Sequence, residues 1–162
     1  MINRTLRLSL SGFLAASFLA GCATVPQGIQ SSRSQAAQTI KAEPPGDYFV
    51  GRRYYKRDFK FWGYVRRPGT PWSTAQMVML NEKEKLAPDR EQLRFGFDNN
   101  YEYRLYGEFG EKVYEPASNG FYPEFRLKRI ELISTNPPPI FKTQIDPRAK
   151  AAATRYQIEK PQ

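Results

Sequence analysis

Chemically reactive side chains are few in this chain of 162 residues. Cys22 is the only cysteine, and the sequence contains no histidine. A thiolate is a good nucleophile, so Cys22 can accept a group by covalent transfer. The absence of histidine removes the commonest general base and the commonest metal ligand at neutral pH. With a single cysteine no disulfide can form within the chain, so the fold must be held by its own core.

The residues before Cys22 are typical of an export signal. Arg4 and Arg7 form a basic start, and the thirteen residues 8–20 form a largely apolar run. A membrane-spanning helix needs about 20 apolar residues, so this run is too short to be one, but it fits a secretory signal. An ordinary signal peptide followed by an incidental cysteine is one interpretation.

The tetrapeptide Leu19-Ala20-Gly21-Cys22 resembles the lipobox of bacterial lipoproteins. This resemblance covers residues 1–22 and implies signal cleavage between Gly21 and Cys22, with a diacylglycerol joined to the Cys22 thiol. Two or three acyl chains such as palmitate would make the membrane attachment effectively permanent, whereas one chain binds only reversibly. In this family, Ala23 in place of aspartate implies sorting to the outer membrane, on its periplasmic face.

Composition divides the chain into four segments. Residues 1–21 are expected to be the signal peptide, and 22–47, rich in Gln, Ser, Ala and Pro, a lipidated flexible tether. Nearly all of the aromatic residues follow residue 47, so 48–141 is expected to be the folded domain, and 142–162 a mobile C-terminal tail that is partly helical. Without Arg4 and Arg7, 23 basic residues face 16 acidic ones, a net charge of +7.

Residue alternation predicts an all-β domain. Residues 101–109 alternate between apolar and polar side chains, as do 93–97 before them, and Asp98-Asn99-Asn100 between the two runs predicts a tight hairpin. Residues 60–66, 75–81 and 124–133 are further strands, the last with a bulge between Leu127 and Ile130 where the apolar phase slips. Residues 82–92 are expected to be a loop or a single helical turn.

Short strands with interior glycines favour a small antiparallel β-barrel or sandwich. The order of a long aromatic first strand, turn-rich links and a coiled last strand loosely resembles OB-like barrels. Some small outer-membrane lipoproteins, including the starvation-inducible lipoprotein group, have a similar organisation over residues 48–134.

The stretch 52–67 interleaves basic and aromatic residues and has seven basic residues against one acidic residue. Such a pattern can bind anionic lipid head groups or acidic envelope polymers, whereas nucleic acid is not an expected partner in the envelope. The residues expected to contact an anionic surface are Arg52, Arg53, Lys56, Arg57, Trp62, Tyr64, Arg66 and Arg67. In the competing interpretation the aromatic residues belong to the core and the charges to a solvated face.

No catalytic motif stands out in the mature chain. Five carboxylates lie in one region of the sequence and could serve a hydrolase: Asp98, Glu102, Glu108, Glu111 and Glu115. The simpler interpretation of Glu102 and Glu108 is a solvent-facing side of a strand. No spacing favours a metal ion, and no cofactor is expected. We therefore expect a non-enzymatic, lipid-anchored envelope lipoprotein whose β-domain is a structural or interaction module, with envelope proteins, anionic lipids or polymers as partners.

Overall fold

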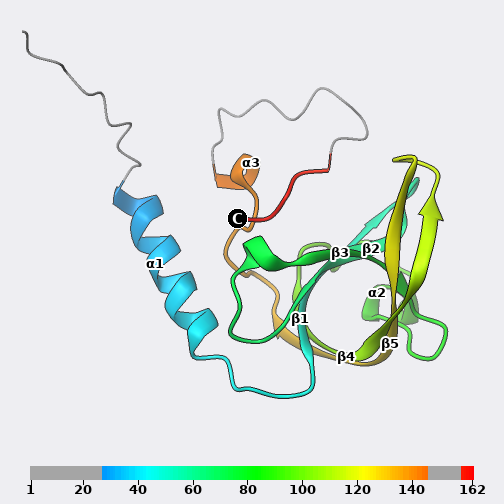
Figure 1. Ribbon diagram of the computed structural model, residues 1–162, viewed down its shortest axis with the longest axis horizontal. Coiled ribbons are helices and arrows are strands. Elements are labelled where there is room, and N and C mark those ends of the chain that lie inside the picture. Colours follow the sequence, from blue (N-terminus) through cyan, green and yellow to red (C-terminus); the bar gives the residue numbers. More distant parts are fainter. Residues whose placement is uncertain (1–26, 146–157) are drawn as a thin grey trace, which may run out of the picture.

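A closed five-stranded barrel is the central feature of the computed structural model, which describes residues 27–145 and 158–162 (Figure 1). Its strands are β1 (Phe49–Lys56), β2 (Lys60–Arg66), β3 (Gln76–Asn81), β4 (Glu102–Glu115) and β5 (Gly120–Ser134). They follow the order β1-β2-β3-β5-β4, and β4 returns to pair with β1. The predicted small all-β barrel is confirmed.

The pairing of β3 with β5 differs from the fully antiparallel barrel that the sequence predicts. Met79 pairs with Glu124 and Asn81 with Arg126 in parallel, whereas the other four strand pairs are antiparallel. Parallel pairing follows from the path of the chain, because β4 lies between β3 and β5 in sequence but at the far side of β5 in space. Alternation within one strand carries no information about the direction of its neighbour.

Several predicted strands agree closely with the structure. The strand predicted over 60–66 is β2, the strand predicted over 75–81 contains β3, and 124–133 lies within β5. The predicted bulge is also confirmed, because Tyr106 pairs with Arg129 and Gly107 with Leu127, which leaves Lys128 as the extra residue. A bulge tightens the local twist, which suits a strand that bends around a small barrel.

The strand predicted over 101–109 lies in β4 from Glu102 onward, but the strand predicted over 93–97 and the hairpin between the two are wrong. Residues 92–101 form turns at one end of the barrel, and β4 pairs with β1 and β5. Two bonds to Asp89 bend this segment, because its backbone oxygen accepts the Arg94 N–H at 2.8 Å and its Oδ2 accepts the Gly96 N–H at 2.9 Å. The predicted helical turn is present before this loop as α2 (Pro88–Glu91), with proline in its first turn.

Two apolar clusters lie on opposite sides of the sheet. The first fills the barrel with residues from all five strands, and its members Val78, Tyr103 and Phe125 are at most 1% exposed. The second covers the outer face of β1 and β2 and includes Tyr64, Trp72 of the short helix η1 (Trp72–Thr74), and Ile140. Both faces of β1 and β2 are therefore buried, so neither strand has the solvent-facing side of a half-buried strand.

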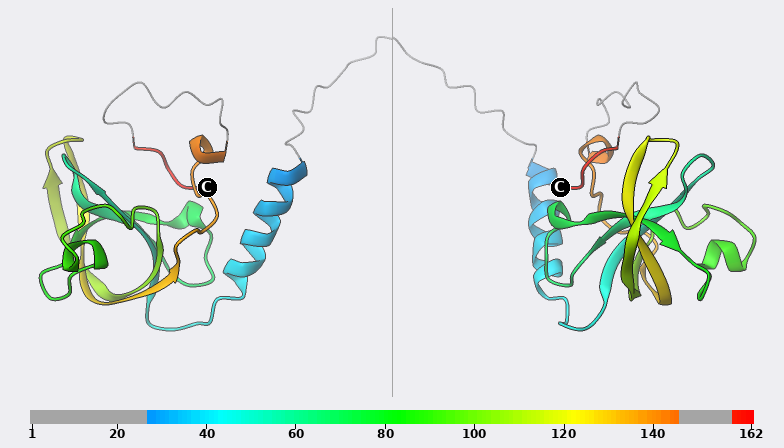
Figure 2. Two further views of the ribbon diagram at one scale, coloured as in Figure 1. Left: turned by 180° about the vertical axis from the view of Figure 1, so that it is seen from behind. Right: turned by 45° about the vertical axis from the view of Figure 1, so that its right-hand side comes forward.

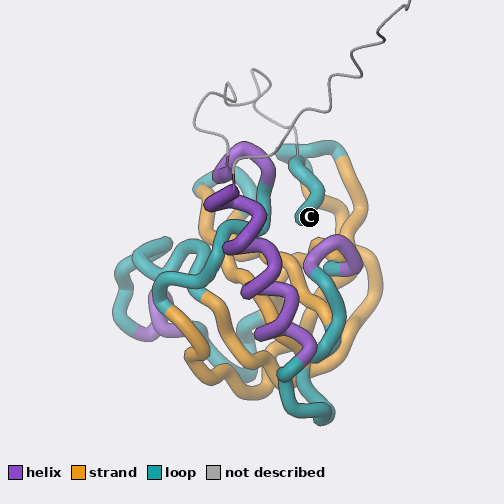
Figure 3. Tube along the Cα trace, turned by 90° about the vertical axis from the view of Figure 1, so that its left-hand side faces the viewer, coloured by secondary structure: helices purple, strands orange, loops and turns teal. Residues whose placement is uncertain are grey.

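Residues 27–41 form the helix α1 (Gln27–Lys41), where the sequence predicts a flexible tether and leaves open whether 33–42 form a transient helix (Figure 3). Its Ile40 packs against the outer cluster, and the Arg33 guanidinium donates to the Gln162 side chain at 3.1 Å. Residues 22–26 of the predicted tether lie outside the described residues. None of the described helices is long and apolar enough to cross a bilayer.

The end of the chain packs on the barrel rather than extending from it. The Gln162 N–H donates to the Ile140 carbonyl at 2.9 Å, and the Tyr64 hydroxyl donates to the Glu159 carbonyl at 2.7 Å. The short helix α3 (Lys142–Ile145) precedes residues 146–157, which lie outside the described residues. The predicted mobile tail thus differs at its last five residues, which these two hydrogen bonds hold against β2 and the segment after β5.

Candidate interaction surface and buried charge clusters

Strand geometry separates the two arginines at the start of the basic and aromatic stretch. Arg52 and Arg53 are neighbours on β1, so their side chains lie on opposite faces of the sheet. Each is only 1% exposed. A charged side chain at that depth needs partners, and the two residues have different ones.

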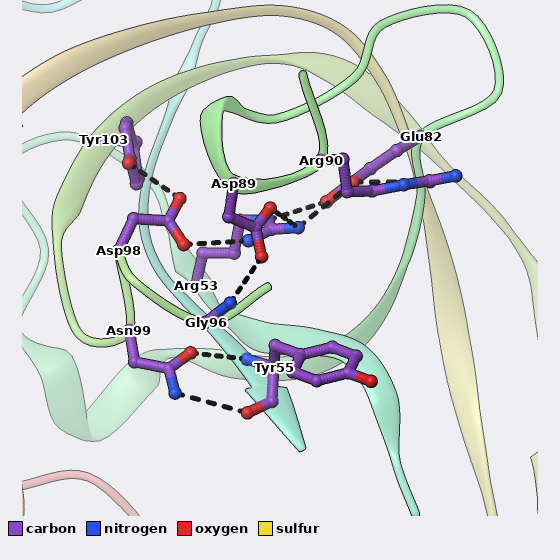
Figure 4. A network of polar contacts seen from close by, with 9 residues as sticks. All are labelled: Arg53, Tyr55, Glu82, Asp89, Arg90, Gly96, Asp98, Asn99 and Tyr103. Atoms are coloured by element: carbon purple, nitrogen blue, oxygen red, sulfur yellow. Dashed lines mark hydrogen bonds and ion pairs between the residues drawn. The ribbon is translucent and has the colours of Figure 1, made fainter. Parts of the chain in front are cut away.

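Arg53 points into the barrel and binds three carboxylates (Figure 4). Its Nε lies 2.6 Å from Glu82, its Nη2 lies 2.7 Å from Asp89, and its Nη1 lies 3.1 Å from Asp98. All three carboxylate side chains are fully buried. Arg90 approaches Glu82 at 3.4 Å from the rim, so the cluster joins β1, the end of β3, α2 and the loop before β4.

Burial shapes the proton affinities in this cluster. It raises the pKa of Asp98 even though Arg53 opposes the rise, and it also raises the pKa of Tyr103, whose hydroxyl donates to Asp98 Oδ2 at 2.9 Å. Burial lowers the pKa of Arg53, but its bonds to Glu82 and Asp89 outweigh that effect and the net shift is upward. Arg53 is therefore a firmly charged centre that holds the loop across the barrel end.

Arg52 and Arg66 lie on the outer face, and each has one carboxylate partner. Arg52 Nη2 lies 2.8 Å from Glu102 and also donates to the Pro138 carbonyl at 2.9 Å. Arg66 forms a two-pronged pair with Glu43 at 2.5 and 2.7 Å. Both guanidinium groups stack on the Trp72 ring, at 5.2 and 4.6 Å from its centroid. These arginines attach the segments before β1 and after β5 to the barrel.

The aromatic residues of the stretch form a packed stack. The rings of Tyr54 and Trp62 stack at 4.8 Å, and Tyr64 meets Trp62 at 5.8 Å and Phe141 at 5.5 Å. Burial raises the pKa values of Tyr54 and Tyr64. Because Phe141 and Ile140 come from the segment after β5, this segment covers the outer face of β1 and β2, and Tyr64 is not open to a ligand.

The structure thus removes half of the residues expected to contact an anionic surface. Arg52, Arg53, Tyr64 and Arg66 are buried, because they make internal ion pairs or pack in the outer cluster, and Trp62 is partly buried. The cations Lys56, Arg57 and Arg67 are exposed. Arg52 and Arg53 are adjacent in the sequence, so on a strand one of them must point to each face, and this was the available signal that they differ. The sequence does not identify their carboxylate partners, which lie 29 to 50 residues away.

Arg67 lies apart from the other two exposed cations. Its guanidinium stacks 4.1 Å from the centroid of the Phe49 ring and reaches Asp47 at 3.5 Å. It lines an open surface depression of about 460 Å³ together with Phe109 and Lys128. The depression lies at the start of β1, where the pairing of β1 with β4 ends. Lys56 and Arg57 lie at the opposite end of β1.

Two hairpins of the barrel carry exposed cationic or aromatic side chains. The β1–β2 hairpin has the exposed cations Lys56, Arg57 and Lys60 around its turn. Residues 110–123 form the end of the β4–β5 hairpin and precede Glu124, the first residue of β5 that pairs with β3. We name this segment the β4–β5 arm. On this arm Tyr114 and Phe121 face solvent with their rings 5.3 Å apart and are 52% and 66% exposed.

The tip of the β4–β5 arm presents no charge to solvent. Glu115 is the one Asp, Glu, Lys or Arg in residues 113–123, and it is 3% exposed. Its carboxylate accepts the N–H groups of Ala117 and Ser118 at 2.9 and 2.8 Å. The acid closes the turn from inside, and the exposed surface of the tip is left neutral and aromatic.

The five carboxylates considered for a hydrolase are engaged separately. Asp98 binds Arg53 inside the barrel, Glu102 binds Arg52 on the outer face, and Glu115 closes the arm. Glu108 pairs with Lys128 at 3.1 Å on the surface, and Glu111 is exposed. In the part of the chain that the structure describes, no group of three or more acidic side chains is arranged to hold a metal ion.

Cys22 and Gly21, the expected acylation and cleavage positions, lie outside the described residues. The first described residue is Gln27, so four residues, 23–26, lie between the cysteine and α1. Comparisons with protein-family models, with curated proteins and with solved structures found no match for this chain.

Proposed function

We propose that this chain is a lipid-anchored envelope protein, attached through Cys22 to the periplasmic face of the outer membrane. Its barrel is a non-enzymatic structural or interaction module. The lipobox-like Leu19-Ala20-Gly21-Cys22 carries the proposal, because it places the acylated thiol at the start of the mature chain. The described part of the chain supports it with a self-contained barrel, whose interior is filled by side chains.

The contacts of α1 support a close link between anchor and barrel. This helix of 15 residues is about 22 Å long and is followed by Glu43, which binds Arg66. A helix docked in this way spaces the barrel from its anchor more tightly than a flexible tether does. The module would therefore work within a few nanometres of the membrane.

The scattered carboxylates support a role other than catalysis. Acid and base groups must converge on one reacting bond, whereas Asp98, Glu102 and Glu115 each serve a different structural contact. An OB-like barrel by itself indicates no particular activity, since function depends on the site that the fold carries.

The anchor is tested by growing cells with an alkyne-labelled fatty acid and comparing the natural chain with Cys22→Ala. Label should appear on the natural chain and be absent from Cys22→Ala, which should also keep its leader. Ser118→Ala is a control that leaves the cysteine in place. Equal labelling of the natural chain and Cys22→Ala would exclude acylation at this residue.

A further inference from the structure

One end of the molecule gathers three features that are far apart in the sequence. In Figures 1 and 2 the first turn of α1, the turn of the β1–β2 hairpin and the tip of the β4–β5 arm all lie toward the upper end. The views of these two figures are related by rotation about the vertical axis, so the shared height is a property of the molecule. The start of α1 lies on the opposite side of the molecule from the two hairpins, so a plane laid across this upper end would pass close to all three features.

The chain leaves α1 at this end in the direction of Cys22. Gln27 is five positions after Cys22, and an extended chain spans at most about 18 Å over five residue steps. A membrane that holds the acyl groups of Cys22 is thereby within reach of the two hairpins. No such closeness holds for the loop 92–101, which lies lower on the barrel in Figure 1.

The side chains at this end have the chemistry of a membrane interface. Tyr114 and Phe121 are exposed, although a soluble surface gains nothing from two neighbouring aromatic rings at a hairpin tip. Aromatic rings are enriched at the level of lipid head groups. Beside them the β1–β2 turn carries Lys56, Arg57 and Lys60 against the single acid Asp58, and basic residues bind anionic head groups.

We propose that the β4–β5 arm and the β1–β2 turn together form a contact surface for an anionic phospholipid bilayer. Tyr114 and Phe121 enter the head-group region, and Lys56 and Arg57 pair with lipid phosphates. This inference rests on the proposed anchor, which supplies the membrane, and it adds that the barrel itself binds lipid in one orientation. Glu115 contributes by directing its carboxylate into the turn, so that residues 113–123 at the tip of the arm present no exposed acid to the lipid.

The test uses residues 23–162, which contain every described element but lack the acylation site. This chain is sedimented with vesicles of phosphatidylcholine, with and without phosphatidylglycerol. We expect binding to the anionic vesicles that weakens with salt. Lys56→Gln/Arg57→Gln should weaken binding about thirtyfold, because each cation near an anionic surface contributes about a factor of five. Tyr114→Ser/Phe121→Ser should weaken it about tenfold or more.

Matched controls remove equivalent groups from the loop between β3 and β4. Lys83→Gln/Arg94→Gln removes two exposed cations, and Leu93→Ser removes a side chain that is 79% exposed. Both control variants should bind anionic vesicles like the natural chain. As a second measurement, the fluorescence emission of Phe121→Trp should shift to the blue when anionic vesicles are added, whereas the emission of Leu93→Trp should not shift.

Several results would overturn the lipid assignment. These are no vesicle binding by the folded natural chain, equal losses in the control and tip variants, or an unshifted Phe121→Trp emission. Binding to an insoluble anionic polysaccharide that needs Lys56 and Arg57 but not the two aromatic residues, without vesicle binding, would assign the surface to a polymer instead. Because the chain tested lacks Cys22, each of these results is independent of the fatty-acid labelling test.

Discussion

Removing the Arg53 side-chain charge should severely destabilise the barrel. In Arg53→Met, three buried carboxylates lose a guanidinium that lies 2.6 to 3.1 Å from them, and only Arg90, at 3.4 Å from Glu82, remains. Removing one partner of a buried ion pair costs about 3–5 kcal/mol. Since three partners are left here, we expect a loss at the upper end of that range, a large share of the roughly 5–15 kcal/mol that stabilises a natural domain.

The assay is urea unfolding of residues 23–162, followed by the fluorescence of Trp62 and Trp72. Arg66→Met is the control, because its guanidinium is equally buried but its one carboxylate partner, Glu43, is 16% exposed and can be hydrated. The control should lose about 1.5–3 kcal/mol, the range for hydrogen bonds to charged groups. Acidification toward the ordinary carboxyl pKa of about 4 should partly restore Arg53→Met and not Arg66→Met.

The reasoning fails if Arg53→Met loses no more stability than Arg66→Met. It also fails if lowering the pH does not reduce the difference in unfolding free energy between the two variants. Should Arg53→Met be unfolded at neutral pH, Arg53→Lys provides a milder version. Lysine keeps the charge but cannot form the forked contacts to Glu82, Asp89 and Asp98 at once. An intermediate stability between the natural chain and Arg53→Met is therefore expected.

Three further changes test other parts of the structure. Burial raises the pKa of Asp98, so the folded state binds this proton at a higher pH than the unfolded chain does. In thermal melts over a pH series, the natural chain should therefore gain stability relative to Asp98→Asn as the pH falls from neutral toward about 4. Gly107→Ala should cost about 1–3 kcal/mol or more in urea unfolding, because a Cβ would lie 2.0 Å from the Arg126 carbonyl oxygen. Removing residues 158–162 should uncover the outer cluster and shift the Trp62 emission to the red.

Local patterns predicted the strands better than the connections between them. Residues 124–133 alternate because one face of the strand must enter the barrel. That alternation predicted the bulge near Lys128 and all of β5 except its first four residues and its last one. Alternation misled at 93–97, because an exposed loop with Leu93 and Phe95 at every second residue has the same pattern as a strand. Whether such residues are buried depends on distant partners that no local window contains.

The buried charges could not be predicted for a related reason. Arg53 is adjacent to Arg52 in a stretch that looks like a basic surface, and the acids that neutralise it come from three other segments. Helix α1 was also missed, since its residues are polar and most are exposed, and a helix of that composition is marginal in isolation. In the structure Ile40 and the Glu43–Arg66 pair attach it to the barrel.

The parallel pairing of β3 with β5 constrains how the barrel can assemble. The strands β1, β2 and β3 are consecutive neighbours and can form as soon as the chain reaches Asn81. The outer edge of β3 must then wait for Glu124–Arg126, with all of β4 synthesised in between. Distant pairings of this kind slow folding, and an open three-stranded sheet exposes an edge to other chains meanwhile. A nascent or truncated chain that stops before residue 124 is therefore an aggregation-prone half-barrel, and completion of the fold depends on its last strand.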